Sequence, residues 1–178
     1  MLPIANLMIE HRLIERMIRV MIAGTQKAKA SGKIDPAFID TAVDFIRTYA
    51  DKLHHGKEED ILFKELAERK ISTEHNRIMG ELLEEHIFGR KTTAALVAAK
   101  ERYVKGDASA LKEIVTHLET LTSFYPRHIE KEDKHFFIPV MDYFDLAEKD
   151  RMTAEFNEFD RDFTRRRYVE VVEKLEKK

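Results

Sequence analysis

Residues 54–63 read His-His-Gly-Lys-Glu-Glu-Asp-Ile-Leu-Phe, and residues 128–137 repeat the pattern as His-Ile-Glu-Lys-Glu-Asp-Lys-His-Phe-Phe. In each copy a histidine stands four residues before a glutamate. The pairs are His54 with Glu58 and His128 with Glu132. On an α-helix, residues four apart project from the same face, one turn from each other. Each copy can therefore direct an imidazole nitrogen and a carboxylate to one point in space.

A second repeated pair belongs to the same pattern. Glu10-His11 returns as Glu85-His86, 75 residues later, and the leading histidines of the two longer segments are 74 residues apart. These nearly equal offsets indicate two copies of one helix pair. Together the copies offer four histidines and two glutamates, side chains that bind transition-metal ions.

The rest of the chain predicts helices. Apolar residues recur at intervals of three and four, which indicates amphipathic helices, and no segment alternates like a strand. Asp35 followed by Pro36 predicts a helix start, and a last, highly charged helix is expected from Glu148 to Lys178. We predict an all-α fold, an antiparallel up-down four-helix bundle with this extra C-terminal helix. The four apolar stripes span residues 4–22, 38–62, 78–103 and 111–136.

The heights of the histidines agree with such a bundle. In an antiparallel helix pair, two residues lie at the same height when the turn is midway between them. The midpoint of His11 and His54 falls beside the glycine of a Ser-Gly pair, and that of His86 and His128 falls at the aspartate of a Gly-Asp pair. Both pairs are predicted turns. We therefore expect the four helices to bring these histidines to one level.

We expect the converging side chains to form a dinuclear metal site. Four imidazoles and two carboxylates are best satisfied by two ions roughly 3.5 Å apart, with both carboxylates bridging. Without cations, burying these groups in an apolar bundle would be costly. Iron is the first choice, and other divalent metals also suit the set. The expected ligands are His11, His54, Glu58, His86, His128 and Glu132.

Four neighbouring side chains are less certain from spacing. Glu15, one turn after His11, can add a seventh ligand or remain a surface acid. His55 is expected to point away from the site, with a place inside it as the alternative. Glu59 and Asp133 follow the ligand glutamates and are expected to be solvated acids or partners of the ligands.

The order of these motifs, together with Glu-His-x-x-Gly-Arg at residues 85–90, resembles the hemerythrin-like, HHE cation-binding family over about residues 4–145. The resemblance implies a four-helix bundle and a non-haem di-iron centre with carboxylate, oxo or hydroxo bridges. It also implies an association with dioxygen, nitric oxide or iron handling. By that resemblance, the six side chains found by spacing take the ligand positions.

One departure from the family stands out. Oxygen-carrying hemerythrins place two histidines one turn apart on the third helix, but the neighbours of His86 at that spacing are Leu82 and Arg90. Glu15 can supply the missing ligand from the first helix. A carboxylate in place of an imidazole favours the oxidised metal, so reaction with dioxygen or peroxide is expected over simple oxygen carriage.

Bulk composition narrows the remaining expectations. A net charge of −2 argues against nucleic acid as a partner, and no apolar run predicts a membrane span. Cysteine is absent, so thiolate and disulfide chemistry is excluded, and a cytoplasmic location is the default. We expect residues 1–145 to form the bundle and residues 146–178 to extend it.

The expected function is to bind, sense or react with dioxygen, peroxide or nitric oxide. The alternatives are an iron store or donor, and a regulatory module that the metal stabilises. Spacing does not decide whether the chain is an enzyme, and it does not identify any protein partner.

Overall fold

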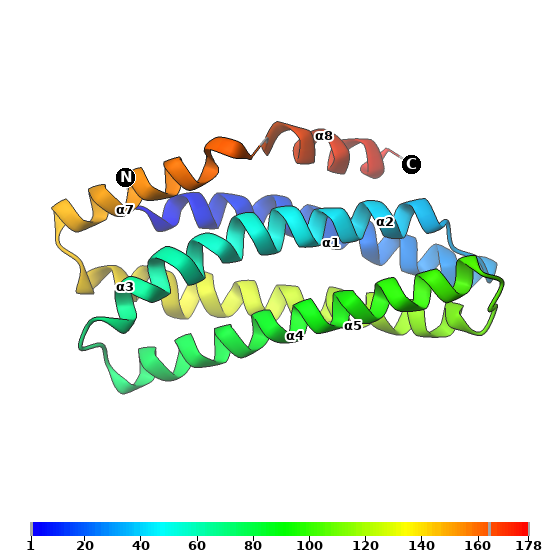
Figure 1. The fold of residues 1–178 in the computed structure, drawn as a ribbon, viewed down its shortest axis with the longest axis horizontal. Coiled ribbons are helices and arrows are strands. Elements are labelled where there is room, and N and C mark those ends of the chain that lie inside the picture. Colours follow the sequence, from blue (N-terminus) through cyan, green and yellow to red (C-terminus); the bar gives the residue numbers. More distant parts are fainter. Residues whose placement is uncertain (1, 164, 178) are drawn as a thin grey trace.

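The computed structural model describes residues 2–163 and 165–177, and these residues form helices and connecting turns without any strand. The prediction of an all-α chain is confirmed for this part of the chain. Long helical rods lie side by side along the long axis of the molecule (Figure 1). The first rod is α1 (Ile4–Ser31) and the third is α4 (Thr73–Val104). The second rod joins α2 (Pro36–Asp44), η1 (Phe45–His55), η2 (Glu58–Phe63) and α3 (Lys64–Ala67). The fourth joins α5 (Ala110–Lys131), η3 (Glu132–Phe136), α6 (Phe137–Val140) and η4 (Met141–Tyr143).

The rods end where the sequence carries turn and capping residues. Gly32 has φ 66° and donates its N–H to the carbonyl of Ala28, which closes α1. Asp35 caps α2, and the Ser72 side chain accepts a hydrogen bond that starts α4. Gly106, with φ 100°, lies in the turn before α5. The fourth rod packs against both α1 and α4.

The C-terminal part differs from the prediction of one helix over Glu148–Lys178. It forms two helices, α7 (Leu146–Phe159) and α8 (Arg165–Glu176), joined by the 3₁₀ turn η5 (Asp160–Asp162). The predicted end at Lys178, and Thr164 between the helices, lie outside the described residues.

The reason for the break lies in the buried side chains of the two helices. α7 buries Met152 and α8 buries Tyr168, sixteen positions later. On one straight helix these positions would point about 160° apart, at about 100° per residue. The break lets both side chains face the rods.

The buried core consists of two apolar clusters with a polar layer between them. Along α1, Leu7 belongs to one cluster and Ile14 to the other, and His11 lies between. Along the fourth rod, Ile129 and Phe136 belong to different clusters, with the buried Glu132 between them. Placing charged groups inside a core is unfavourable unless they are paired or bind ions. This polar layer is therefore the candidate functional site of the fold.

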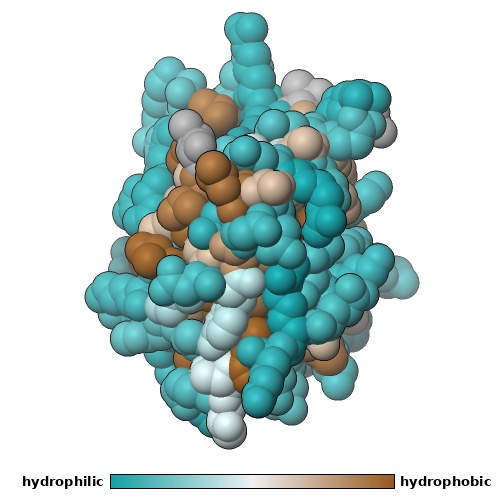
Figure 2. Space-filling model, turned by 90° about the vertical axis from the view of Figure 1, so that its left-hand side faces the viewer, coloured by the Kyte–Doolittle hydropathy of each residue, from teal (hydrophilic) through white to brown (hydrophobic). Residues whose placement is uncertain are grey.

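The surface is mainly polar. The end of the molecule at the left of Figure 1 is largely hydrophilic, with separate hydrophobic patches (Figure 2). Large apolar side chains that remain exposed elsewhere include Ile87 and Phe88 of α4. Among the described helices, none is both long and apolar enough to cross a membrane.

Candidate metal centre

The polar layer brings together the six side chains predicted to converge. They come from all four rods, and each is at most 2% exposed. Glu58 places Oε1 3.2 Å from His54 Nε2 and Oε2 3.3 Å from His86 Nε2. Glu132 connects another pair of histidines in the same way. Its Oε2 lies 3.1 Å from His11 Nε2, and its Oε1 lies 3.2 Å from His128 Nε2.

Most of the atoms that face the centre lack hydrogen bonds, and the exception is a 2.8 Å contact between His11 Nε2 and His54 Nε2. Both carboxylate oxygens of Glu58 and of Glu132 are buried without a hydrogen-bond partner among the described residues. The same holds for Nε2 of His86 and of His128. A buried polar atom left unpaired costs about 1–3 kcal/mol. Cations at the centre would satisfy all of these atoms, so the side chains present fit a metal site.

The spacing of these atoms also fits shared ions. Two ligand atoms that each lie about 2.1 Å from one ion, at angles of about 90–110°, stand roughly 3.0–3.4 Å apart. The four nitrogen–oxygen distances given above lie between 3.1 and 3.3 Å. These atoms are therefore spaced as ligands around ions are. The nitrogen and the oxygen of each pair do not form a hydrogen bond, which agrees with a role as metal ligands.

Each of these four imidazoles is oriented from behind by a carboxylate. The outer nitrogen, Nδ1, donates to that carboxylate, which leaves the lone pair of Nε2 free to face the centre, as in most protein metal sites. The donors and acceptors are His11 with Asp133 (2.7 Å), His54 with Glu10 (2.9 Å), His86 with Glu59 (2.7 Å) and His128 with Glu85 (2.8 Å).

These carboxylates follow the sequence repeat. Glu59 and Asp133 hold equivalent positions in the two copies, and of their two predicted roles, solvated acids or partners of the ligands, the structure shows the second. Glu10 and Glu85 also hold equivalent positions, but spacing predicted no role for them. Their repeated place directly before a histidine is the signal that could have found them.

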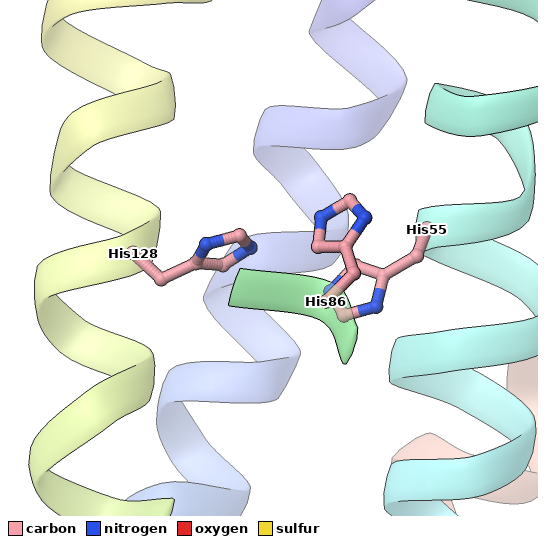
Figure 3. Close-up of side chains that lie close together, drawn as sticks. All are labelled: His55, His86 and His128. Carbon is pink, nitrogen blue, oxygen red and sulfur yellow. The ribbon is translucent and has the colours of Figure 1, made fainter. Parts of the chain in front are cut away.

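His55 enters the centre, so the expectation that it points elsewhere is wrong. It is 3% exposed and stacks on His86 with ring centroids 3.9 Å apart. Figure 3 shows the imidazoles of His55, His86 and His128 approaching one another from three helices. One nitrogen from each lies within 4.8 Å of the others. Burial, followed by the charges of the neighbouring imidazoles, lowers the pKa of His55 well below its usual value, so the ring is neutral at neutral pH.

The segment that carries the two consecutive histidines departs from α-helical geometry. η1, which contains His54 and His55, is π-helical. A π-helix closes i→i+5 hydrogen bonds, so each residue turns by less than the 100° of an α-helix. Consecutive side chains then diverge less around the axis. Such a departure from the α-helix cannot be predicted from the spacing of the histidines.

Glu15 lies outside the cluster. Its side chain is 32% exposed and forms an ion pair with Arg12 at 3.2 Å. The structure thus keeps this carboxylate at the surface. The fifth imidazole, expected to be missing, comes instead from His55 of the second rod.

A pair of substitutions distinguishes surface from interior carboxylates. We expect Glu15→Gln to leave the metal content and the optical spectrum unchanged, because its carboxylate faces solvent and Arg12. Glu58→Gln should lower metal content, because both of its oxygens face imidazole nitrogens. Elemental analysis of both variants after identical loading tests this. Equal losses in both would restore Glu15 as a ligand.

The charges inside the layer are coupled. Burial alone would lower the pKa of His11, but Asp133 and Glu132 outweigh it and raise that pKa to about 10. Burial likewise opposes Glu132, Glu58 and Glu59, which raise the pKa of His86 to about 11. The pKa of Glu132 falls well below its usual value, because His128, His11 and His86 overcome its burial. Before cations bind, imidazolium protons therefore balance the carboxylates.

A cavity reaches this layer from one side. It has a volume of about 320 Å³ and is lined by the two stacked histidines, His55 and His86. Tyr125, Asp51 and Arg90 contribute to its walls, and Arg90 donates to Asp51 at 2.8 Å. Such a volume accommodates molecules of a few atoms. A larger groove of about 780 Å³ lies between α1, α2 and the end of α8, and none of the side chains of the polar layer lines it.

Comparison with known proteins gives one match. A family model described as the hemerythrin HHE cation binding domain matches residues 2–140. No curated protein and no solved structure matches the chain.

Proposed function

Because the chain belongs to the hemerythrin HHE cation-binding domain family, we propose that it is a non-haem di-iron protein that binds, senses or reacts with dioxygen or a related small molecule such as peroxide or nitric oxide. The observation that carries the proposal is the set of buried, unpaired ligand atoms on Glu58, Glu132, His86 and His128. Dioxygen, peroxide and nitric oxide are small enough for the cavity beside them.

The proposal includes the arrangement of the rods as an antiparallel up-down four-helix bundle. Turns at Gly32, Ser72 and Gly106 separate the rods, and α5 packs against α1 and α4. In such a bundle, ligands from facing helices project into one interior level.

Five imidazoles and two carboxylates would hold the ions. His11 and His54 group with both glutamates, whereas His55, His86 and His128 form a second group. Each group would hold one ion, and Glu58 and Glu132 would contribute to both, since the two oxygens of each glutamate face different histidines. Iron bound there would supply one-electron redox chemistry and a position for a small ligand. Other divalent metals that accept imidazole and carboxylate ligands also fit.

The residues of this chain perform the remaining tasks. The outer carboxylates orient the imidazoles and keep Nε2 unprotonated when ions bind. The two apolar clusters exclude bulk water from both sides of the layer. His55 and Tyr125 line the cavity, so they are placed to contact a small ligand that enters it.

Access through the cavity can be tested at a glycine. A Cβ at Gly89 would meet only Phe124, at an ordinary 3.5 Å, so a larger side chain there should fit and narrow the cavity. We expect Gly89→Leu to slow the reaction of the iron(II) protein with dioxygen by about tenfold or more at unchanged iron content. The rate is measured by rapid mixing and absorption.

Gly80→Leu on the same helix is the matched control. Gly80 is exposed, has no neighbour within 4 Å of an added Cβ and does not line the cavity. It should react at the parent rate. Equal rates for the parent and Gly89→Leu would show that small molecules reach the centre by another path.

The iron donor is the second candidate, since the ligand imidazoles can bind protons in place of ions. Protons on His11 and His86 compete with ions, because the two pKa values are about 10 and about 11. Exposure of the iron(II)-loaded protein to air separates the candidates. A new visible absorption band with oxidation of the iron supports the first. An unchanged spectrum, with transfer of iron to an apo acceptor, supports the donor.

A further inference from the structure

A lysine is fully buried next to the centre. Lys57, one residue before Glu58, is 0% exposed. Its ammonium contacts the carboxylate of Glu10 and lies 2.7 Å from Asp160. A buried ammonium needs such partners, because transferring an unpaired charge from water is costly. Two of the groups around it, Glu10 and Asp160, come from opposite ends of the chain.

The C-terminal segment completes this network. Arg165, at the start of α8, contacts the same Glu10 oxygen and lies 2.6 Å from the second oxygen of Asp160. The other oxygen of Glu10 accepts the Nδ1–H of His54 at 2.9 Å. The junction between α7 and α8 therefore reaches a candidate metal ligand through a single carboxylate.

Close packing keeps this junction in place. The ring of Phe159, at the end of α7, lies so near Gly56 that an added Cβ would meet it at 2.8 Å. Gly56 belongs to the repeated segment, and the residue at its place in the second copy is the exposed Glu130. The two copies thus differ where the C-terminal segment rests on the first.

The repeat supplies an internal comparison. Lys131 holds in the second copy the place of Lys57 and lies 2.6 Å from Glu85, which orients His128. Lys131 is 25% exposed and Glu85 is 29% exposed, whereas Lys57 and Glu10 are both 0% exposed. Exposed ion pairs are weakened by water and salt. The two copies therefore share the same sequence pattern, but the lysine–glutamate pair is fully buried in the first copy and partly exposed in the second.

We propose that the C-terminal extension is a clamp that makes the two metal positions unequal. Lys57, Asp160 and Arg165 act as positioning residues that fix Glu10 and, through it, His54. The ion held by His11 and His54 is then retained, while the ion beside the cavity exchanges more readily. This inference rests on the proposed function, because it requires two bound ions.

Cobalt(II) is the probe, bound to the full chain and removed with an excess of chelator. We expect two ions per chain and two dissociation phases of equal amplitude. In the double variant Asp160→Asn/Arg165→Met the slow phase should become about tenfold faster, the low end of the effect typical for partners of metal ligands. The fast phase and the helical circular dichroism should not change.

Two controls separate positioning from general stability. Arg165→Lys keeps the positive charge and should retain the slow phase. Lys131→Met removes the equivalent contact of the second copy and should accelerate only the fast phase. An unchanged slow phase in the double variant, or acceleration of both phases alike, overturns the clamp. Fewer than two cobalt ions on the parent protein overturns the dinuclear centre itself.

Discussion

His128→Ala is expected to reduce bound metal from two ions per chain to one or fewer. The imidazole of His128 belongs to the group beside the cavity, and its Nε2 is one of the buried atoms without a hydrogen bond. Its removal also leaves Glu85 without the ring that it orients. Loss of a ligand should weaken binding by at least the 10–100-fold reported for partners of ligands. Elemental analysis after gel filtration measures the change.

His135→Ala is the control for this experiment. His135 lies in the same repeated segment but is exposed to solvent, and no metal-binding group contains it. The control should keep two ions. Equal metal content in His128→Ala and His135→Ala would contradict the assignment of the centre.

Metal removal should give the protein a marked pH dependence of stability. His11 and His86 have folded-state pKa values of about 10 and about 11, above the ordinary imidazole value near 6.5. Protonation of these two imidazoles contributes fully to the free energy of unfolding below their unfolded-state pKa. The contribution is lost as the pH rises through their folded-state pKa values. Between pH 7 and 9 the free energy of unfolding should fall by about 1 kcal/mol or more per pH unit.

Denaturant titration of the chelator-treated protein at several pH values measures this fall. The metal-loaded protein should show no such slope in the same range. Imidazoles that bind ions are unprotonated at Nε2 in the folded state, and free imidazoles are mostly neutral in the unfolded state at these pH values, so unfolding takes up no proton. His11→Gln should remove about half of the slope. A metal-free protein whose stability is constant from pH 7 to 9 would contradict the coupling of these imidazoles to the buried carboxylates.

Regular features of the sequence predicted most of the structure. Apolar spacing indicated the helices, and residues with special backbone preferences marked their ends, as at Gly32 and Asp35. The convergence of His11 with His54 followed from two rules, helix rise and turn position. Both rules depend only on local geometry, so one sequence suffices to apply them.

The differences arose where residue spacing along one helix does not determine what a side chain contacts. His55 faces the centre from the π-helical segment η1, whose geometry apolar spacing does not reveal. Glu15 remained outside because its carboxylate pairs with Arg12 at the surface, which four-residue spacing alone does not reveal. The break between α7 and α8 depends on where Met152 and Tyr168 find buried partners, which is a property of the packed molecule.

The buried ionic contacts could not be predicted from the spacing of residues. Lys57 lies in a strongly charged stretch of sequence, yet it is fully buried. Its burial depends on Asp160 and Arg165, more than 100 residues away in sequence. Long-range pairs of this kind cannot be chosen from the many charges of a chain that is 36% charged.

The central claim is that one buried layer holds two metal ions between the rods. Titration of the metal-free full chain with iron(II) under anaerobic conditions, followed by elemental analysis, tests it most directly. We predict saturation at two ions per chain in the parent and a clear deficit in a Glu58→Gln/Glu132→Gln variant that retains its helical content. Saturation at one ion or none in the parent, or two ions in the variant, would contradict the account.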